Sequence, residues 1–278
     1  MLVLLISLLA CSGEVAPAPT EAPPAAAEAP APAAPETPDI DVDEMQKEAD
    51  EAALVPSPVE TQKALEGSGI DVKLATLIPK HKFDLNASDM DHAAVRSGVL
   101  LADVLLTVKT AETPALVKRL SAVQKGMNQL NGGSDIDAVL EDIKERLTAE
   151  AVTRDELLKE LDELSGAVIP ELEFNGQKRV VPLIQAGSWL EGANLVARAV
   201  QSAETTEAAE KLLKAPAVVD YFIEYVKTDG AEKAPEAVTQ KLEESLNELK
   251  TLAEKKDPLT KADIDRVVEV TNAVLALL

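Results

Sequence analysis

The pattern of apolar and polar positions along this chain is helical. From residue 55 onward, apolar side chains recur at intervals of three and four positions, which gathers them on one face of an α-helix. No stretch alternates between apolar and polar residues for more than a few positions, as a half-buried strand would. The pattern predicts short helices at 58–66 and 71–78, one helix that begins at 134, and helices at 88–110, 113–130, 153–174, 178–201, 204–228, 233–255 and 260–277.

Capping motifs mark the ends of these helices. A Ser or Thr followed three residues later by an acidic residue can exchange side-chain-to-backbone hydrogen bonds at a helix start. Such pairs occur at Ser88-x-x-Asp91, Ser134-x-x-Asp137, Thr153-x-x-Glu156 and Thr260-x-x-Asp263. Thr113 is expected to cap its helix ahead of Pro114, and Pro170 is expected to kink or split the helix that contains it. With short loops between neighbours, we expect an all-α, irregular multi-helix bundle of about seven to nine helices.

The composition supports a helical domain, and the charge limits the classes of molecule that the domain is expected to bind. Ala, Leu, Glu and Lys dominate, and only 2% of the residues are aromatic. The net charge of −22 repels nucleic acid and anionic lipid headgroups, so no nucleic-acid partner is expected. Solubility is one explanation of the charge, and the binding of cations or of a basic partner is the other.

The first ten residues are an apolar run that ends immediately before the only cysteine of the chain. A bilayer span takes about 20 apolar residues, so the run fits a signal peptide rather than a membrane helix. Residues Leu8-Leu9-Ala10-Cys11 resemble a lipobox, the processing site of bacterial lipoproteins. The resemblance implies cleavage before Cys11, diacylglycerol on its thiol and a fatty acid such as palmitate on its new amine. Ser12 resembles an outer-membrane sorting signal.

Two alternatives stay open for this leader. No Lys or Arg precedes the apolar run, so either translation starts upstream or the signal is weak. A buried N-terminal helix with a chance cysteine is the competing structure. The segment that follows argues against that helix, because a Pro/Ala spacer makes little sense behind a core element.

The chain divides by composition into four parts. Residues 1–10 are the predicted lipoprotein signal peptide. Residues 11–38 begin with the lipidated Cys11 and continue as a disordered linker, in which 15–38 holds eight Pro and ten Ala. Residues 39–54 are acidic and form either a frayed helix or a disordered segment. The helical domain is expected at 55–278.

The stretch 55–200 resembles an uncharacterised family of exported all-helical bacterial proteins, often lipoproteins. The residues that carry the resemblance are Val55-Pro56-Ser57-Pro58-Val59-Glu60, Gly98-Val99-Leu100-Leu101-Ala102-Asp103 and Gly187-Ser188-Trp189-Leu190-Glu191-Gly192. The resemblance implies a helical fold and an exported location, and it implies no activity.

Charged side chains on two apolar helices indicate an interior polar cluster. Asp103 interrupts the apolar residues around it, and Glu191 does so in the 178–201 helix, which is apolar nearly all round and therefore predicted to be central. Arg198 lies two turns beyond Glu191 on the same face. We hypothesise a buried cluster of Asp103, Trp189, Glu191 and Arg198. It either fixes how the helices dock or forms a pocket for a cationic or polar ligand.

Catalytic and metal-binding patterns are weak in this sequence. His81, Asp84, Asp89, Asp91 and His92 lie close together, but their spacing fits neither a helical zinc pair nor a calcium loop. No phosphate-binding glycine loop or nucleophile motif is present in the sequence. We therefore expect no metal site, no cofactor and no enzymatic activity. Residues Tyr221, Phe222 and Tyr225 are expected to face the core or a partner.

These patterns predict a membrane-anchored lipoprotein with a helical binding or scaffolding domain. The expected location is the bacterial cell envelope, at the outer membrane, with lipid on Cys11 as the anchor and an envelope protein as the partner. One alternative is a carrier of a small molecule or lipid in a cavity of the bundle. The other is a metal-dependent envelope enzyme that uses residues 81–92.

Overall fold

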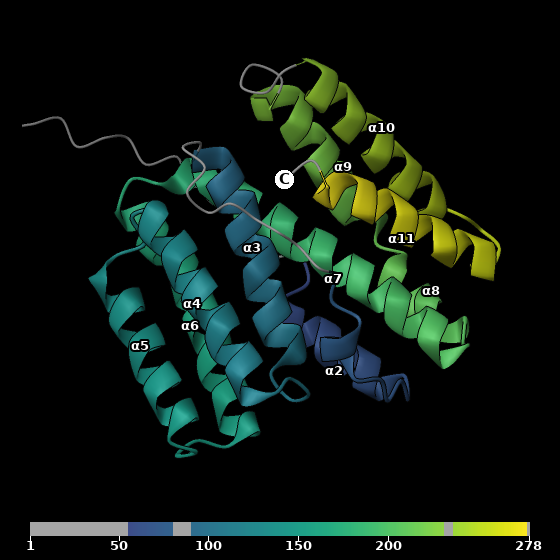
Figure 1. Ribbon diagram of the computed structural model, residues 1–278. Helices are drawn as coiled ribbons and strands as arrows, with labels where there is room; N and C mark the ends of the chain where they lie inside the picture. The colour runs from purple at the N-terminus through teal and green to yellow at the C-terminus, as the bar shows by residue number, and fades with distance from the viewer. Residues whose placement is uncertain (1–54, 80–89, 231–235, 277–278) are drawn as a thin grey trace, which may run out of the picture. The chain divides into compact units, whose positions relative to one another are not determined.

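The closest helix pair in the computed structural model consists of α3 (Met90–Thr107) and α7 (Val181–Ala203), which contact each other more extensively than any other two elements. The structure describes residues 55–79, 90–230 and 236–276. Two glycines allow this approach. A Cβ atom on Gly98 would lie 2.0 Å from the carbonyl oxygen of Ile184, and one on Gly187 would lie 2.0 Å from that of Val95. The two backbones therefore approach each other directly at these glycines. Figure 1 shows α3 and α7 crossing.

A first core lies between α3 and the helices that follow it. These are α4 (Thr113–Gln129), α5 (Ser134–Thr148) and α6 (Arg154–Phe174). The start of α7 also contributes. The largest buried side chains of the first core are Leu105, Leu116, Leu120, Met127, Leu130, Leu140, Ile143, Leu157, Leu161 and Leu172.

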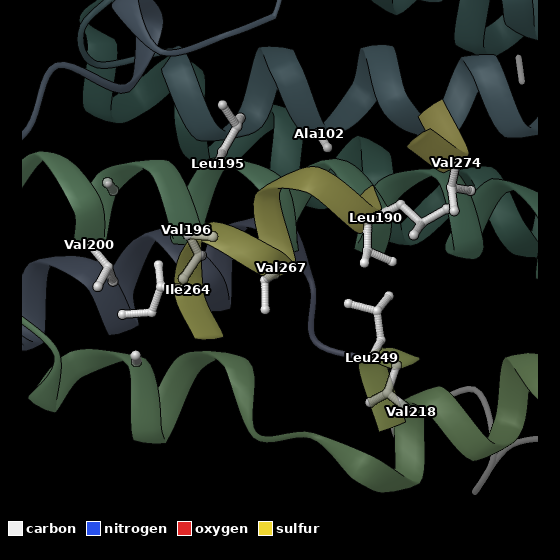
Figure 2. Close-up of a cluster of buried hydrophobic side chains, with 14 of the residues drawn as sticks. Ala102, Leu190, Leu195, Val196, Val200, Val218, Leu249, Ile264, Val267 and Val274 are labelled. Carbon is white, nitrogen blue, oxygen red and sulfur yellow. The ribbon is translucent and has the colours of Figure 1, made fainter. Parts of the chain in front are cut away.

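A second core lies between α7 and the C-terminal helices. These are α8 (Glu207–Leu213), α9 (Pro216–Tyr225), α10 (Glu236–Ala253) and α11 (Lys261–Leu275), with α2 (Pro58–Gly67) and the 3₁₀ turn η1 (Leu74–Thr76) at its edge. Figure 2 labels these side chains of the second core: Ala102, Leu190, Leu195, Val196, Val200, Val218, Leu249, Ile264, Val267 and Val274.

The two cores share α3 and α7, which explains why both helices are apolar on most of their surface. On α3, Leu101 and Leu105 belong to the first core, while Ala102 and Leu106 belong to the second. Helix α7 follows a short 3₁₀ turn, η2 (Lys178–Val180), and passes from the first core to the second along its length. The predicted central position of the 178–201 helix is therefore confirmed.

The described part of the chain is all-helical, as the sequence predicted. Nine of its α-helices are ten residues or longer, and no strand occurs among the described residues. In that part, each helix is too short or too polar to cross a membrane. The predicted signal peptide, Cys11, the Pro/Ala linker and the acidic segment 39–54 all lie outside the described residues.

Capping motifs placed some helix starts correctly. Thr153 and Glu156 form a reciprocal capping box at α6, and Thr260 and Asp263 form one at α11. Ser57 caps α2 in the same way with Glu60. In each of these three motifs the acidic side chain bonds back to the start of its own helix.

Two other predicted caps are placed differently. Gly133, and not Ser134, is the residue that precedes the first turn of α5, and Asp137 accepts hydrogen bonds from Gln124 and Asn128 of α4. Helix α4 begins at Thr113 rather than after it. The hydroxyl of Thr113 accepts a hydrogen bond from Arg154 instead of capping the helix.

Two predicted helices have different extents, and a third is not split at its proline. The predicted helix at 71–78 is only η1. The predicted helix at 204–228 divides into α8 and α9 at Pro216, which disfavours helical backbone at the preceding Ala215, and it ends in a π-turn, η3 (Val226–Gly230). Helix α6 continues through Pro170 because the proline lies in its last turns and on its exposed side. There water can solvate the carbonyl group left without a helical donor.

Candidate functional site

Asp103 of α3 and Glu191 of α7 face each other where these two helices pack. Asp103 is 4% exposed and Glu191 is fully buried. The negative charge of Glu191 acts on Asp103 across this interface. We call these residues the carboxyl pair.

The surroundings of Asp103 favour its protonated form. Burial raises the pKa of Asp103 well above its usual range, because the interior disfavours the ionised form, and the nearby charge of Glu191 raises it further. The guanidinium of Arg119 on α4 acts in the opposite direction and lowers the pKa of Asp103. Asp103 therefore stays protonated at pH values where an exposed aspartate is ionised.

Arg119 is connected to the carboxyl pair through a buried threonine. Its NH1 group donates to Oγ1 of Thr107 over 3.1 Å, and that hydroxyl donates to the main-chain oxygen of Asp103 over 2.5 Å. Arg119 is only half-buried. Three helices therefore meet around Asp103: α3, α4 and α7.

Arg198 belongs to a second polar group, between α7 and α11. Its Nε donates to Oδ1 of Asn194 over 2.8 Å, and its NH2 donates to Oδ1 of Asn272 over 3.1 Å. The fully buried Asn194 in turn donates from Nδ2 to Oγ1 of Thr271 over 2.8 Å and to Asn272 over 3.0 Å. This group ties α7 to α11.

Trp189 contacts aromatic side chains of α9. Its ring centroid lies 5.4 Å from that of Phe222, which in turn lies 5.1 Å from that of Tyr221. Phe222 is buried in the second core, and Trp189 and Tyr221 pack against that core while remaining partly exposed. The contact adds aromatic packing between α7 and α9.

The four residues hypothesised as one cluster thus have different neighbours. The structure brings Asp103 and Glu191 together, places Trp189 against α9 and joins Arg198 to α11. Sequence reasoning missed Asn194 and Thr271. A signal for Asn194 was present, since it is a polar residue on an apolar helix, one turn before Arg198. Its partners 77 and 78 residues away could not be read from the sequence.

The acidic and histidine-containing segment is described only in part. His81, Asp84 and Asp89 lie outside the described residues. Asp91 forms an ion pair with Arg179, whose NH1 lies 2.6 Å from its Oδ1. Within the described ranges, no group of three or more His, Cys, Asp or Glu side chains is arranged to hold a metal ion.

An open polar hollow of about 550 Å³ lies along α4 at the start of α5. It is lined by Ser121, Gln124, Lys125, Asn128, Gln129 and Asp137. Asp137 accepts from Gln124 over 2.7 Å and from Asn128 over 2.9 Å, and these hydrogen bonds lower its pKa. Gln124, Asn128 and Asp137 of the hollow thus join α4 to α5.

Comparison of the chain with protein-family models, with curated proteins and with solved structures found no match. The function is therefore argued from the sequence and from the geometry above.

Proposed function

We propose that this protein is a membrane-anchored lipoprotein whose acidic helical domain binds another protein of the bacterial envelope. The observation that carries the proposal is the sequence Leu8-Leu9-Ala10-Cys11 behind an apolar run. Two acyl chains on Cys11 supply a stable anchor, since each buried methylene contributes about 0.8 kcal/mol. Ser12 favours the outer membrane as the destination.

The domain is suited to binding rather than to insertion in lipid. Buried polar side chains join α7 to α11, and α3 packs closely on α7 at two glycines, so the exposed faces are presented by a well-packed body. The chain's charge of −22 favours a basic partner surface. Phe174, at the end of α6 beside the exposed Glu173, is 87% exposed and offers an apolar contact within that acidic surface.

Intact-mass measurement of the membrane-extracted chain tests the anchor. We expect a chain that begins at Cys11 and carries the added mass of diacylglycerol and a further acyl group. The matched Cys11→Ala variant should keep its leader and carry no lipid mass. A wild-type protein that retains Met1 and lacks fatty acid would refute the proposed anchor.

Site-specific photocrosslinking in cells tests the binding role. A photoreactive residue at position 174 should give one discrete adduct with an envelope protein. The same residue at position 159, where Lys159 is also exposed on α6, serves as the matched control. A reproducible absence of discrete adducts at 174, with the chain correctly lipidated, would contradict partner binding through this end of α6 and leave the anchor intact.

A further inference from the structure

Helix α4 differs in charge from the rest of this acidic chain. It carries Lys118, Arg119 and Lys125 and no acidic residue, and it is the only α-helix in the described ranges with this composition. The whole chain has 49 acidic and 27 basic residues. A basic helix on such a chain attracts carboxylates rather than other cations.

The outer side of α4 presents two lysines without an anionic partner. Lys118, Ser121 and Lys125 are all exposed, and we call these three residues the basic face. The lysines are seven residues apart, so they share one side of the helix at a spacing of about 10 Å along its axis. Within the described ranges neither forms an ion pair, whereas Lys250, for example, pairs with Asp220.

The chain itself contains a carboxylate-rich segment with a matching spacing. Residues 42–54 precede the first described residue and hold five acidic side chains and one basic side chain. In a helix, Glu44, Glu48 and Glu51 share one face. Glu44 and Glu51 are seven residues apart, which is also the spacing of the two lysines of the basic face.

The segment ends close to the core that α4 helps to form. Val59, four residues beyond the first described residue, is buried in the first core together with Leu116 and Leu120 of α4. The thirteen residues 42–54 can extend over about 40 Å. A short tether of this kind keeps the segment at an effective concentration on the order of millimolar, so a few weak ion pairs are enough to hold it.

We propose that residues 42–54 dock on the basic face of α4 in their own chain, with the carboxylates of Glu44, Glu48 and Glu51 directed to the two lysines. The docked segment neutralises the basic face and leaves the acidic surfaces of the domain open to a basic partner. A second copy of the chain carries the same carboxylates, but the tethered segment is favoured because it is joined to the domain that it binds. The contact does not depend on the lipid anchor or on the partner proposed for Phe174.

Trypsin cleavage of the full-length chain after Lys47 tests the docking. Lys47 is the only basic residue among the first 54, so this cut reports specifically on the segment. At low ionic strength, Lys118→Glu/Lys125→Glu should accelerate the cut by about two- to fivefold for each lost ion pair. Added salt should accelerate the cut in the wild type, relative to a free peptide of residues 42–54, because exposed ion pairs are screened.

The matched control for this cleavage is Lys73→Glu/Lys256→Glu. It makes the same change of charge at two exposed lysines outside α4, and it should leave the rate of the cut after Lys47 unchanged. Equal cleavage rates in the wild type and in the α4 variant would overturn the proposal. Equal acceleration by the control variant would do so too, because the effect would then come from net charge alone.

Carbodiimide crosslinking locates the contact directly. The reagent joins an amine to a carboxylate that lies against it, so the Lys250–Asp220 ion pair, with 2.5 Å between its charged atoms, is the internal positive control. We expect crosslinks within one chain between residues 42–54 and Lys118 or Lys125. If the control crosslink forms and these crosslinks are absent, or join only different chains, the docking within one chain is refuted.

An exchange of charges separates specific pairing from a general effect of charge. Lys118→Glu/Lys125→Glu should abolish the crosslinks between α4 and the segment. Adding Glu44→Lys/Glu51→Lys to the same chain should restore them with the amine and the carboxylate exchanged. A chain that carries all four substitutions and still forms the control crosslink, but no crosslink between α4 and the segment, would contradict the proposed ion pairs.

Discussion

Glycine at two facing positions determines how closely α3 and α7 approach. Gly98 and Gly187 each lie where a Cβ atom would overlap a carbonyl oxygen of the opposite helix. Gly192, also on α7, has no atom within 4 Å of the corresponding position. The three glycines look alike in the sequence, but only two of them are required by contact.

We expect Gly187→Ala to lower the free energy of unfolding by about 1–3 kcal/mol, because α3 and α7 must separate to admit the methyl group. Gly192→Ala is the matched control in the same helix. It should be neutral or stabilising by up to about 1 kcal/mol, since alanine favours helix and has room there. Urea unfolding at pH 7 measures both. Equal effects of the two substitutions would contradict the backbone contact.

Single residues also show where sequence reasoning stops. The sequence indicated that Asp103 and Glu191 need partners, because a charge on an apolar helix is costly unless it is paired or neutralised. The structure supplies each to the other. Arg198 was assigned to the same group because it follows Glu191 by two turns. Its hydrogen bonds go to Asn194 and to Asn272 on α11, and that choice depends on how distant helices pack.

At the scale of elements, local signals succeeded where the acidic residue bonds back to the start of its own helix. The caps at Thr153 and Thr260 were predicted correctly, because their acidic partners bond back to the helix start. At α5 the N-cap residue is Gly133 rather than the predicted Ser134, and Asp137 is engaged by α4. The helical spacing of apolar residues and the lack of strand-like alternation predicted the all-α class correctly, since both depend only on local periodicity.

The cap of α11 should make part of the stability sensitive to acid. Lys255 and Thr260 hold the pKa of Asp263 at about 2, below its usual 3.8. This stabilisation is present above pH 3.8 and is lost as the pH falls toward 2. At pH 7 we expect Asp263→Ala to cost about 1 kcal/mol, the usual cost of losing a cap.

Urea unfolding of wild type and Asp263→Ala between pH 7 and pH 2 measures this effect. The difference between the two proteins should shrink as the pH approaches 2. Asp257→Ala, in the exposed turn before α11, is the control and should match the wild type throughout. A difference that stays constant down to pH 2 would show that the carboxylate charge is not involved.

At the scale of the whole described domain, the two cores should unfold together. Both contain side chains from α3 and α7, so neither core is complete without helices that the other also requires. Trp189 packs against the second core and is the only tryptophan of the chain, which makes its fluorescence a specific probe of that region.

We expect far-ultraviolet circular dichroism and Trp189 fluorescence to report one transition in urea. Leu161→Ala removes a fully buried side chain of the first core and should cost about 2–5 kcal/mol. Its midpoint should shift equally in both signals, although Trp189 belongs to the other region. Separate midpoints in the two signals would mean that the cores unfold independently.

The glycine contact also determines which changes in length the segment between α3 and α7 can accommodate. Sliding one helix along the other by a single residue would drive a Cβ atom into a carbonyl group, so the alignment of the pair is fixed by steric exclusion. The loops that join α4, α5 and α6 have no part in setting that alignment. The fold can therefore accommodate insertions or deletions in those loops without moving Asp103 away from Glu191. The segment that contains α4, α5 and α6 is a natural place for lineage-specific variation or for inserted sequence.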